Sequence, residues 1–301
     1  MCVRHMESFL APSELIVNDD GSIFHLHMRP EQLADRVILV GDPGRVDAVA
    51  GWFSSVECEA WSREFRFVTG TYGGKRITVL STGIGCDNID IVMNELDALA
   101  NIDLGARRVM EKHRQLTIVR IGTCGGLQPN TPVGTFIASV KSIGFDGLLN
   151  YYAGRDEVCD LGLERAFVRH MDWSPLKGAP YVASACGELV DQIACDDMVR
   201  GITVACGGFY GPQGRRLRLR TQDPEQNEKV EAFRYADPVT GEVLRVCNYE
   251  MESSALAGLS ALLGHRAMTC CMVIANRYAG EVDTAYKNSI DALICKVLDR
   301  I

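Results

Sequence analysis

The 301-residue sequence has no long apolar run, no paired cysteine spacing and no excess of basic residues. A membrane-spanning helix needs about 18 or more consecutive apolar residues, and a signal peptide needs an uninterrupted apolar core near the N-terminus. This sequence contains neither feature. Lys and Arg number 31 against 39 Asp and Glu, for a net charge of −8, whereas nucleic-acid-binding proteins are typically basic. We therefore expect a soluble, cytoplasmic protein whose partners include neither membranes nor nucleic acids.

The twelve cysteines are scattered, with no CxxC spacing. Disulfide scaffolds are shorter chains and zinc sites show paired spacings, so we expect reduced and mostly buried thiols. Hydrophobic residues make up 47% and charged residues 23% of the chain, as in ordinary globular proteins. The length allows one large α/β domain or two smaller ones. Because we find no internal repeat, one domain over residues 1–301 is the simpler prediction.

Three short apolar runs lead into glycine-rich loops, which are GDPGR (41–45), STGIG (81–85) and GTCGG (122–126). Runs rich in β-branched residues suit strands buried on both faces, and their alternation with helical patterns predicts an α/β sheet. Loops at the carboxyl ends of such strands commonly bind ligands. Later strands are predicted at 135–140, 180–185 and 267–277, and helices at 253–264 and 284–301. The polar segment 216–243 is predicted to be a surface insertion.

Arg120 lies at the end of the apolar run LTIVRI. A guanidinium inside a buried strand is costly unless it meets an anion. That anion could be a ligand phosphate or a core carboxylate, and the sequence favours neither. Together with Arg45 and the hydroxyl of Thr123, Arg120 could form a compact phosphate cradle at the ends of neighbouring strands.

The sequence Glu250-Met251-Glu252 lies just before the helix predicted from Ser253. Glutamates near a helix N-terminus commonly do no more than favour the helix dipole. Alternatively, a carboxylate in a pocket could accept both vicinal hydroxyls of a ribose while the methionine packs on the sugar. The dipole explains the glutamates but gives no reason for a methionine between them.

Seven motifs in this order resemble the nucleoside phosphorylase-I family, and within it the uridine phosphorylases most closely. They are GDPGR, SREF (62–65), STGIG, RIGTCGG (120–126), FYGPQGR (209–215), NYEMES (248–253) and VIANR (273–277). The resemblance runs from Phe24 to about Arg277. It implies a three-layer α/β/α sandwich with a mixed, partly barrel-like central sheet. It also implies a homo-oligomer, most simply a homodimer, whose active sites are shared between subunits.

The resemblance also implies a role for each motif residue. The phosphate ligands would be Gly41, Arg45, Arg120 and Thr123, with Arg63 of the partner subunit. The ribose would be bound by Thr123, Met251 and Glu252, with His25 of the partner subunit. The base would contact Phe209, Gln213, Arg215, Glu250, Ile274 and Arg277. The catalytic set would be Arg45, Arg120, Gln213, Arg215 and Glu252. Inorganic phosphate would be the co-substrate, and catalysis would need no cofactor.

Gln213 and Arg215 favour a pyrimidine nucleoside as substrate. A glutamine amide can match the O2 and N3–H edge of uracil, and an arginine can donate to O4 and stabilise negative charge there. Purine enzymes of the family resemble a different pattern, with an aspartate after the last strand, where this chain has Asn276-Arg277. We therefore expect phosphorolysis of uridine, with a purine nucleoside phosphorylase as the alternative. A dinucleotide oxidoreductase would need a GxGxxG motif, which is missing. A silent nucleoside-binding protein would not need the full set of arginines.

Several positions depart from the family pattern. Bacterial relatives have a motif like PGQxR where this chain has GPQGR, and small residues where it has Cys86-Asp87-Asn88. The resemblance implies a structural cation at the dimer interface, held by Glu64, Ile84 and Asn88, and an added carboxylate from Asp87 would favour a divalent ion. Segments 101–115 and 216–243 are longer than in compact bacterial members. These extra elements could block further association and leave a dimer instead of a hexamer.

Overall fold

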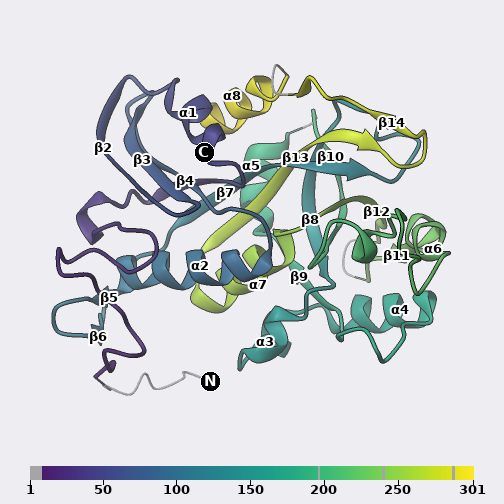
Figure 1. Cartoon of the computed structure of the whole chain (residues 1–301), viewed down its shortest axis with the longest axis horizontal. Coiled ribbons are helices and arrows are strands. Elements are labelled where there is room, and N and C mark those ends of the chain that lie inside the picture. Colours follow the sequence, from purple (N-terminus) through teal and green to yellow (C-terminus); the bar gives the residue numbers. More distant parts are fainter. Residues whose placement is uncertain (1–8, 196, 239–240, 287–288) are drawn as a thin grey trace. The chain divides into compact units, whose positions relative to one another are not determined.

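The computed structural model describes residues 9–301 except 196, 239–240 and 287–288. The chain forms two compact units. The first unit comprises Met1–Gly83 with Ile91–Ile118, and the second comprises Ile84–Asp90 with Val119–Ile301. Each unit has its own strands and helices (Figure 1). A single domain over 1–301 stays a prediction.

The first unit is built on a three-stranded antiparallel meander, to which a fourth strand is added in parallel. Its elements are η1 (Pro30–Gln32), β1 (Arg36–Val40), α1 (Pro43–Ala50), β2 (Ser55–Ser62), β3 (Phe65–Tyr72), β4 (Lys75–Ser81), β5 (Ile102–Asp103) and β6 (Arg108–Val109). Strand β1 pairs parallel with β4, and β4, β3 and β2 pair antiparallel in that order. The predicted loop GDPGR is short because α1 already begins at Pro43. Asp42 caps this helix by accepting a hydrogen bond from the Gly44 amide (2.9 Å).

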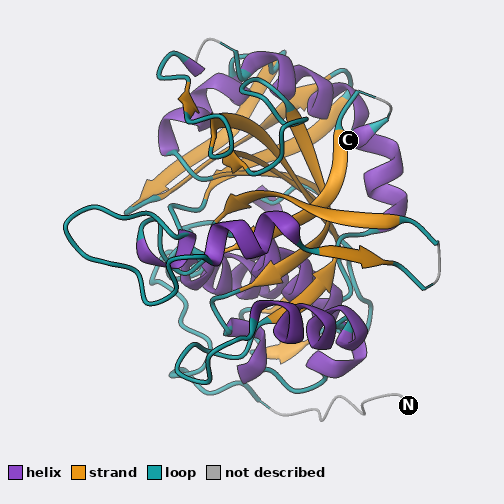
Figure 2. Cartoon of the chain, turned by 90° about the vertical axis from the view of Figure 1, so that its right-hand side faces the viewer, coloured by secondary structure: helices purple, strands orange, loops and turns teal. Residues whose placement is uncertain are grey.

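The second unit contains a closed barrel. The barrel strands are β7 (Thr117–Gly126), β13 (Arg266–Asn276), β8 (Phe136–Gly144), β10 (Val199–Ala205) and β12 (Val243–Glu250), in the order in which they pair. The barrel closes where Asn248 and Tyr249 of β12 pair antiparallel with Gly126 and Gly125 of β7. The expected mixed, partly barrel-like sheet is confirmed. Figure 2 shows the curved strands with helices outside them.

The glycines of GTCGG explain how β7 and β12 close the barrel. We expected residues 122–126 to be a loop, but they continue strand β7 to Gly126. A Cβ atom on Gly126 would lie 2.7 Å from the Thr131 carbonyl oxygen. The backbone at Thr131 is therefore too close to Gly126 to leave room for any side chain there. These glycines therefore let a bent strand pass close to its neighbours.

The remaining elements of the second unit surround the barrel. They are η2 (Leu148–Tyr151), α3 (Arg155–Val158), α4 (Leu161–Met171), β9 (Tyr181–Ser184), α5 (Gly187–Ala194), η3 (Gly211–Gln213), α6 (Gln226–Ala232), β11 (Arg234–Ala236), α7 (Ser253–Leu263), β14 (Glu281–Val282) and α8 (Asp291–Arg300). Helix α2 (Cys86–Asn101) begins in the second unit and ends in the first. None of the helices in the described ranges has the length and apolarity needed to cross a membrane.

Most of the predicted elements are confirmed, with shifted ends. Helix α7 ends at Gly264, which adopts a left-handed conformation (φ 76°) as expected for a C-terminal cap. The last helix begins at Asp291, later than the predicted 284, and residues 287 and 288 of the prediction lie outside the described residues. The segment 216–243 contains α6 and β11, and its residues 239 and 240 also lie outside them. The described cysteines are all free, and six of them are buried.

Candidate functional site

Three charged side chains form a buried cluster in the second unit. Arg120 lies on β7, Glu250 ends β12, and Glu252 lies just before α7. Arg120 Nη1 donates to Glu250 Oε2 (3.2 Å), and Arg120 Nη2 contacts Glu252 Oε2. All three side chains are at most 5% exposed. The sequence left open whether Arg120 meets a ligand or a core carboxylate. In the structure Arg120 meets two carboxylates, both from the Glu-Met-Glu motif.

Glu250 holds the start of helix α7. Its carboxylate accepts hydrogen bonds from the amides of Glu252 (2.9 Å) and Ser253 (3.0 Å) and from the Ser253 hydroxyl (2.6 Å). Burial raises the pKa of Glu250 to about 7, although Arg120 acts in the opposite direction. Burial also opposes the charge on Arg120, but the carboxylates of Glu252 and Glu250 outweigh it and keep the pKa of Arg120 above its ordinary value. Glu250 therefore stabilises the start of α7, as the helix-dipole interpretation predicts.

Glu252 is fixed from a second side by the STGIG loop. Its Oε1 accepts a hydrogen bond from the Gly85 amide (2.7 Å), while Oε2 faces Arg120. The thiol of Cys86 donates to the Met251 carbonyl oxygen (3.1 Å), so the start of α2 contacts the motif twice. A carboxylate has about four acceptor positions. Two are used here, which leaves positions for two further hydroxyl donors.

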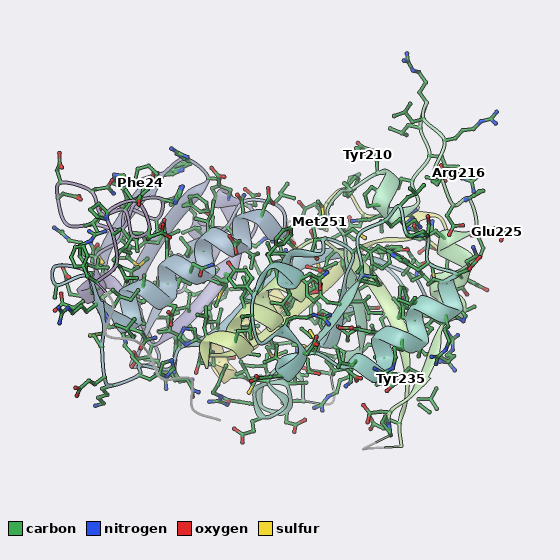
Figure 3. The ribbon with its side chains drawn as sticks, turned by 90° about the horizontal axis from the view of Figure 1, so that it is seen from below. Phe24, Tyr210, Arg216, Glu225, Tyr235 and Met251 are labelled. Carbon is green, nitrogen blue, oxygen red and sulfur yellow. The ribbon has the colours of Figure 1, made fainter. Side chains whose placement is uncertain are left out.

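The loop around η3 brings together four of the six residues predicted to bind the base, whereas Glu250 belongs to the Arg120 cluster and Ile274 lies on β13. Arg215 Nη1 donates to the Phe209 carbonyl oxygen (2.7 Å) and contacts Gln213 Oε1, and the Arg215 guanidinium lies 3.7 Å from the centre of the Phe209 ring. Arg277, which follows β13, donates to the Gln213 carbonyl oxygen (3.2 Å). Figure 3 shows Tyr210 of this loop and Met251 on the same side of the second unit.

Two arginines in this loop region carry uncompensated charge. Burial, followed by repulsion from Arg277, lowers the pKa of Arg215 to about 10. Burial also lowers the pKa of Arg277. Within the described ranges, neither guanidinium forms an ion pair with a carboxylate. Two partly buried cations without a counter-ion suit a ligand group that carries or develops negative charge.

Several predicted site residues belong to the first unit. Arg45 is buried on the first turn of α1, and a Cβ atom on Gly41 would lie 3.4 Å from the Gly83 carbonyl oxygen. The His25 ring contacts the Glu95 carboxylate (2.6 Å). Arg63 lies in the turn between β2 and β3, with φ 55°. The predicted roles of these residues in phosphate and ribose binding stay predictions.

The other predicted residues are placed as follows. Thr123 and Ile274 are half-buried on β7 and β13. Of the predicted cation ligands, Glu64 follows β2, and Ile84 and Asn88 lie before and within the first turn of α2.

The structure adds residues that the sequence did not predict. Ser253 belongs to the NYEMES motif and Gly85 to the STGIG motif, so the sequence could have indicated both. Asn227 of α6 lies in a polar segment that contains no motif.

Comparisons with known proteins identify the family of the chain. The family model of the phosphorylase superfamily matches residues 35–297. A uridine phosphorylase of Thermococcus kodakarensis is 28% identical over 93% of this chain and 86% of its own length. A uridine phosphorylase of Haemophilus influenzae is 30% identical over 87% of this chain and 89% of its own. A Trypanosoma brucei nucleoside phosphorylase, whose crystal structure is described as showing uridine phosphorylase activity, is 29% identical with a TM-score of 0.84, covering 95% of this chain and 100% of that one. The chain therefore belongs to the phosphorylase superfamily.

Proposed function

We propose that this protein is a cytoplasmic uridine phosphorylase, which converts uridine and inorganic phosphate to uracil and ribose 1-phosphate without a cofactor. The contact between Arg120 and Glu252 carries the proposal, because it joins a guanidinium suited to phosphate to a carboxylate suited to the ribose hydroxyls. The similarity to the uridine phosphorylases of two organisms supports the substrate. Free cysteines fit a reducing compartment.

The reaction exchanges one bond for another at C1′ of the ribose. The bond from C1′ to N1 breaks, and its electron pair leaves with the uracil. A phosphate oxygen then forms a bond to C1′ from the opposite face, and the uracil takes up the proton that the hydrogen phosphate ion loses. Arg120 would hold the phosphate with Arg45, Thr123 and Arg63 of the partner subunit. Catalysis then consists of positioning and charge stabilisation and needs no enzyme nucleophile.

The departing uracil collects negative charge, which Arg215 would stabilise at O4. Gln213 would bind the O2 and N3–H edge, because its amide both donates and accepts. Arg277 adds a second positive charge behind this pair. Glu252 would accept the ribose hydroxyls at its two free acceptor positions. In this proposal, separate elements of the second unit bind the sugar and the base.

Asn276 argues against the purine alternative. The purine pattern of the family has an aspartate after the last strand to protonate N7 of the base, whereas here β13 ends at Asn276 and no carboxylate follows until Glu281. Its Nδ2 donates to the carbonyl oxygens of Gln128 (3.2 Å) and Thr131 (2.7 Å), and its Oδ1 accepts from the Ala279 amide (2.8 Å). The side chain is thus engaged in holding turns and offers no acidic proton.

The direct test compares uridine with inosine, each with and without phosphate. We expect ribose 1-phosphate and free uracil from uridine only when phosphate is present, and much slower release of hypoxanthine from inosine. Preferential cleavage of inosine would establish the purine alternative. Cleavage of uridine at the same rate without phosphate would show a hydrolase and contradict the proposal.

We further propose a homodimer in which each active site takes Arg63 from the partner subunit. Arg63→Ala and Arg120→Ala, purified alone, are each expected to be nearly inactive. When both chains are co-expressed and the mixed dimer is purified with two tags, about half of its sites should be intact, because one site receives neither substitution. Recovered activity in the mixed dimer checks the prediction. A mixed dimer as inactive as its parents would show that the sites are not shared.

A further inference from the structure

The helix α6, which lies within the surface insertion, holds the base-recognition loop in place. Gln226, the first residue of α6, is 5% exposed, and its Nε2 donates to the Pro212 carbonyl oxygen (2.7 Å) inside that loop. Arg216 and Glu225, labelled in Figure 3, mark the two ends of the excursion that leads from the loop to α6. Helix α6 thus contacts the base-recognition loop that precedes it in the sequence.

Asn227 makes the most informative of these contacts. With its amide oriented so that each atom meets a complementary partner, its Oδ1 accepts from Arg277 Nη2 (3.1 Å). Its Nδ2 donates to the Gln213 carbonyl oxygen (3.2 Å) and to the Tyr249 hydroxyl (3.3 Å). Since Arg277 also donates to the same Gln213 carbonyl oxygen (3.2 Å), the three residues form a closed ring of hydrogen bonds.

The loop fits closely against this asparagine. Gly214 has φ 67°, a conformation that other residues rarely adopt, and a Cβ atom there would lie 2.6 Å from the nearest atom of the Asn227 side-chain amide. A loop with glycines at 208, 211 and 214 has little rigidity of its own. Its neighbours must therefore supply the rigidity that a precise recognition site requires.

Resting on the proposed function, we infer that Asn227 is a positioning residue for uracil recognition, which orients Gln213 and Arg277 without reducing the positive charge of the base site. The neutral amide is the decisive feature. A carboxylate at this position would satisfy the same Arg277 hydrogen bond but would neutralise a charge that the departing base needs. An amide fixes the guanidinium and leaves its charge available.

Two substitutions separate positioning from charge. Asn227→Ala removes the ring of hydrogen bonds and is expected to lower kcat/KM for uridine about tenfold, with the KM for phosphate unchanged. Asn227→Asp keeps the acceptor that faces Arg277, replaces the donor to the Gln213 carbonyl oxygen and adds a negative charge beside Arg277. It is therefore expected to lower kcat by about tenfold or more. Because 5-fluorouracil is a more acidic leaving group, the Asn227→Asp defect should be smaller with 5-fluorouridine than with uridine. A purely structural role would affect both substrates equally.

Glu228→Ala is the matched control, because Glu228 is the next residue of α6 and is exposed. It should keep wild-type kinetics, and thermal unfolding should show that all three variants are folded. Wild-type kcat/KM in both Asn227 variants, or equal defects with the two nucleosides in Asn227→Asp, would overturn the inference. If the wild-type protein itself released no uracil from uridine, the proposed function would be wrong. That result is distinguishable from a failure of the inference about Asn227, because it is measured without any variant.

Discussion

Replacing Arg120 by alanine is expected to lower kcat/KM for uridine phosphorolysis by about 10²–10³ or more. The guanidinium is the charge that would hold phosphate next to the Glu252 carboxylate, and no neighbouring side chain in the cluster can replace it. Removal also leaves Glu250 and Glu252 buried with their shared cation missing. Breaking such a buried pair typically costs about 3–5 kcal/mol of stability, so activity must be measured on protein shown to be folded.

The assay is steady-state release of uracil at saturating phosphate, with circular dichroism and thermal unfolding on the same samples. Arg300→Ala is the control, because Arg300 donates to the Asp197 carboxylate (3.0 and 3.1 Å) on the second unit without belonging to the predicted site. That variant should retain close to wild-type kcat/KM. Near-full activity of folded Arg120→Ala would remove Arg120 from the mechanism.

Replacing Arg215 by alanine is expected to lower kcat by about 10²–10³, because the departing uracil loses its main source of charge stabilisation. The phosphate ligands are untouched, so the KM for phosphate should not change. The Phe209 ring, which now lies 3.7 Å below the guanidinium, would be uncovered. Initial rates over a grid of uridine and phosphate concentrations separate the two effects.

Arg216→Ala provides the comparison for this variant. Arg216 is the neighbouring arginine, and its guanidinium donates to the Pro224 carbonyl oxygen (2.9 Å) on the exposed side of the loop. It should leave kcat within about twofold of wild type, as surface substitutions usually do. Equal losses in Arg215→Ala and Arg216→Ala would indicate a general disturbance of the loop and no specific role for Arg215.

The sequence was sufficient to predict features that depend on the local residue pattern, such as the end of a helix, and on the free-energy cost of burying a charge. Arg120 inside an apolar run had to meet an anion, and the structure supplies two glutamates that motif reasoning had already selected. Glu250 accepts hydrogen bonds from the start of α7, as the helix-dipole interpretation predicts, while the ribose-binding role of Glu252 stays a prediction. Similarly, Gly264 marked the end of α7 because a left-handed residue is needed there.

Long-range pairing could not be predicted in this way. Glycines 125 and 126 were interpreted as a loop, because nothing local shows that β12 pairs with them to close the barrel. Asn227 was missed for the same reason: it is one polar residue in a polar segment, and its partners Gln213 and Arg277 lie far from it in the sequence. The last helix begins late because the segment before Ile290 is polar and the buried residues start at Ile290 and Leu293.

The sharing of one guanidinium between two carboxylates has a consequence for how the substrates bind. The triad of Arg120, Glu250 and Glu252 carries a net charge of about −1 when both acids are ionised, which disfavours an incoming anion. In the proposed site, a sugar that donated its hydroxyls to Glu252 would weaken the hold of that carboxylate on Arg120 and so free the guanidinium for phosphate. Each substrate should therefore tighten the affinity for the other by the same factor, a thermodynamic reciprocity that calorimetric titration of one in the presence of the other would reveal.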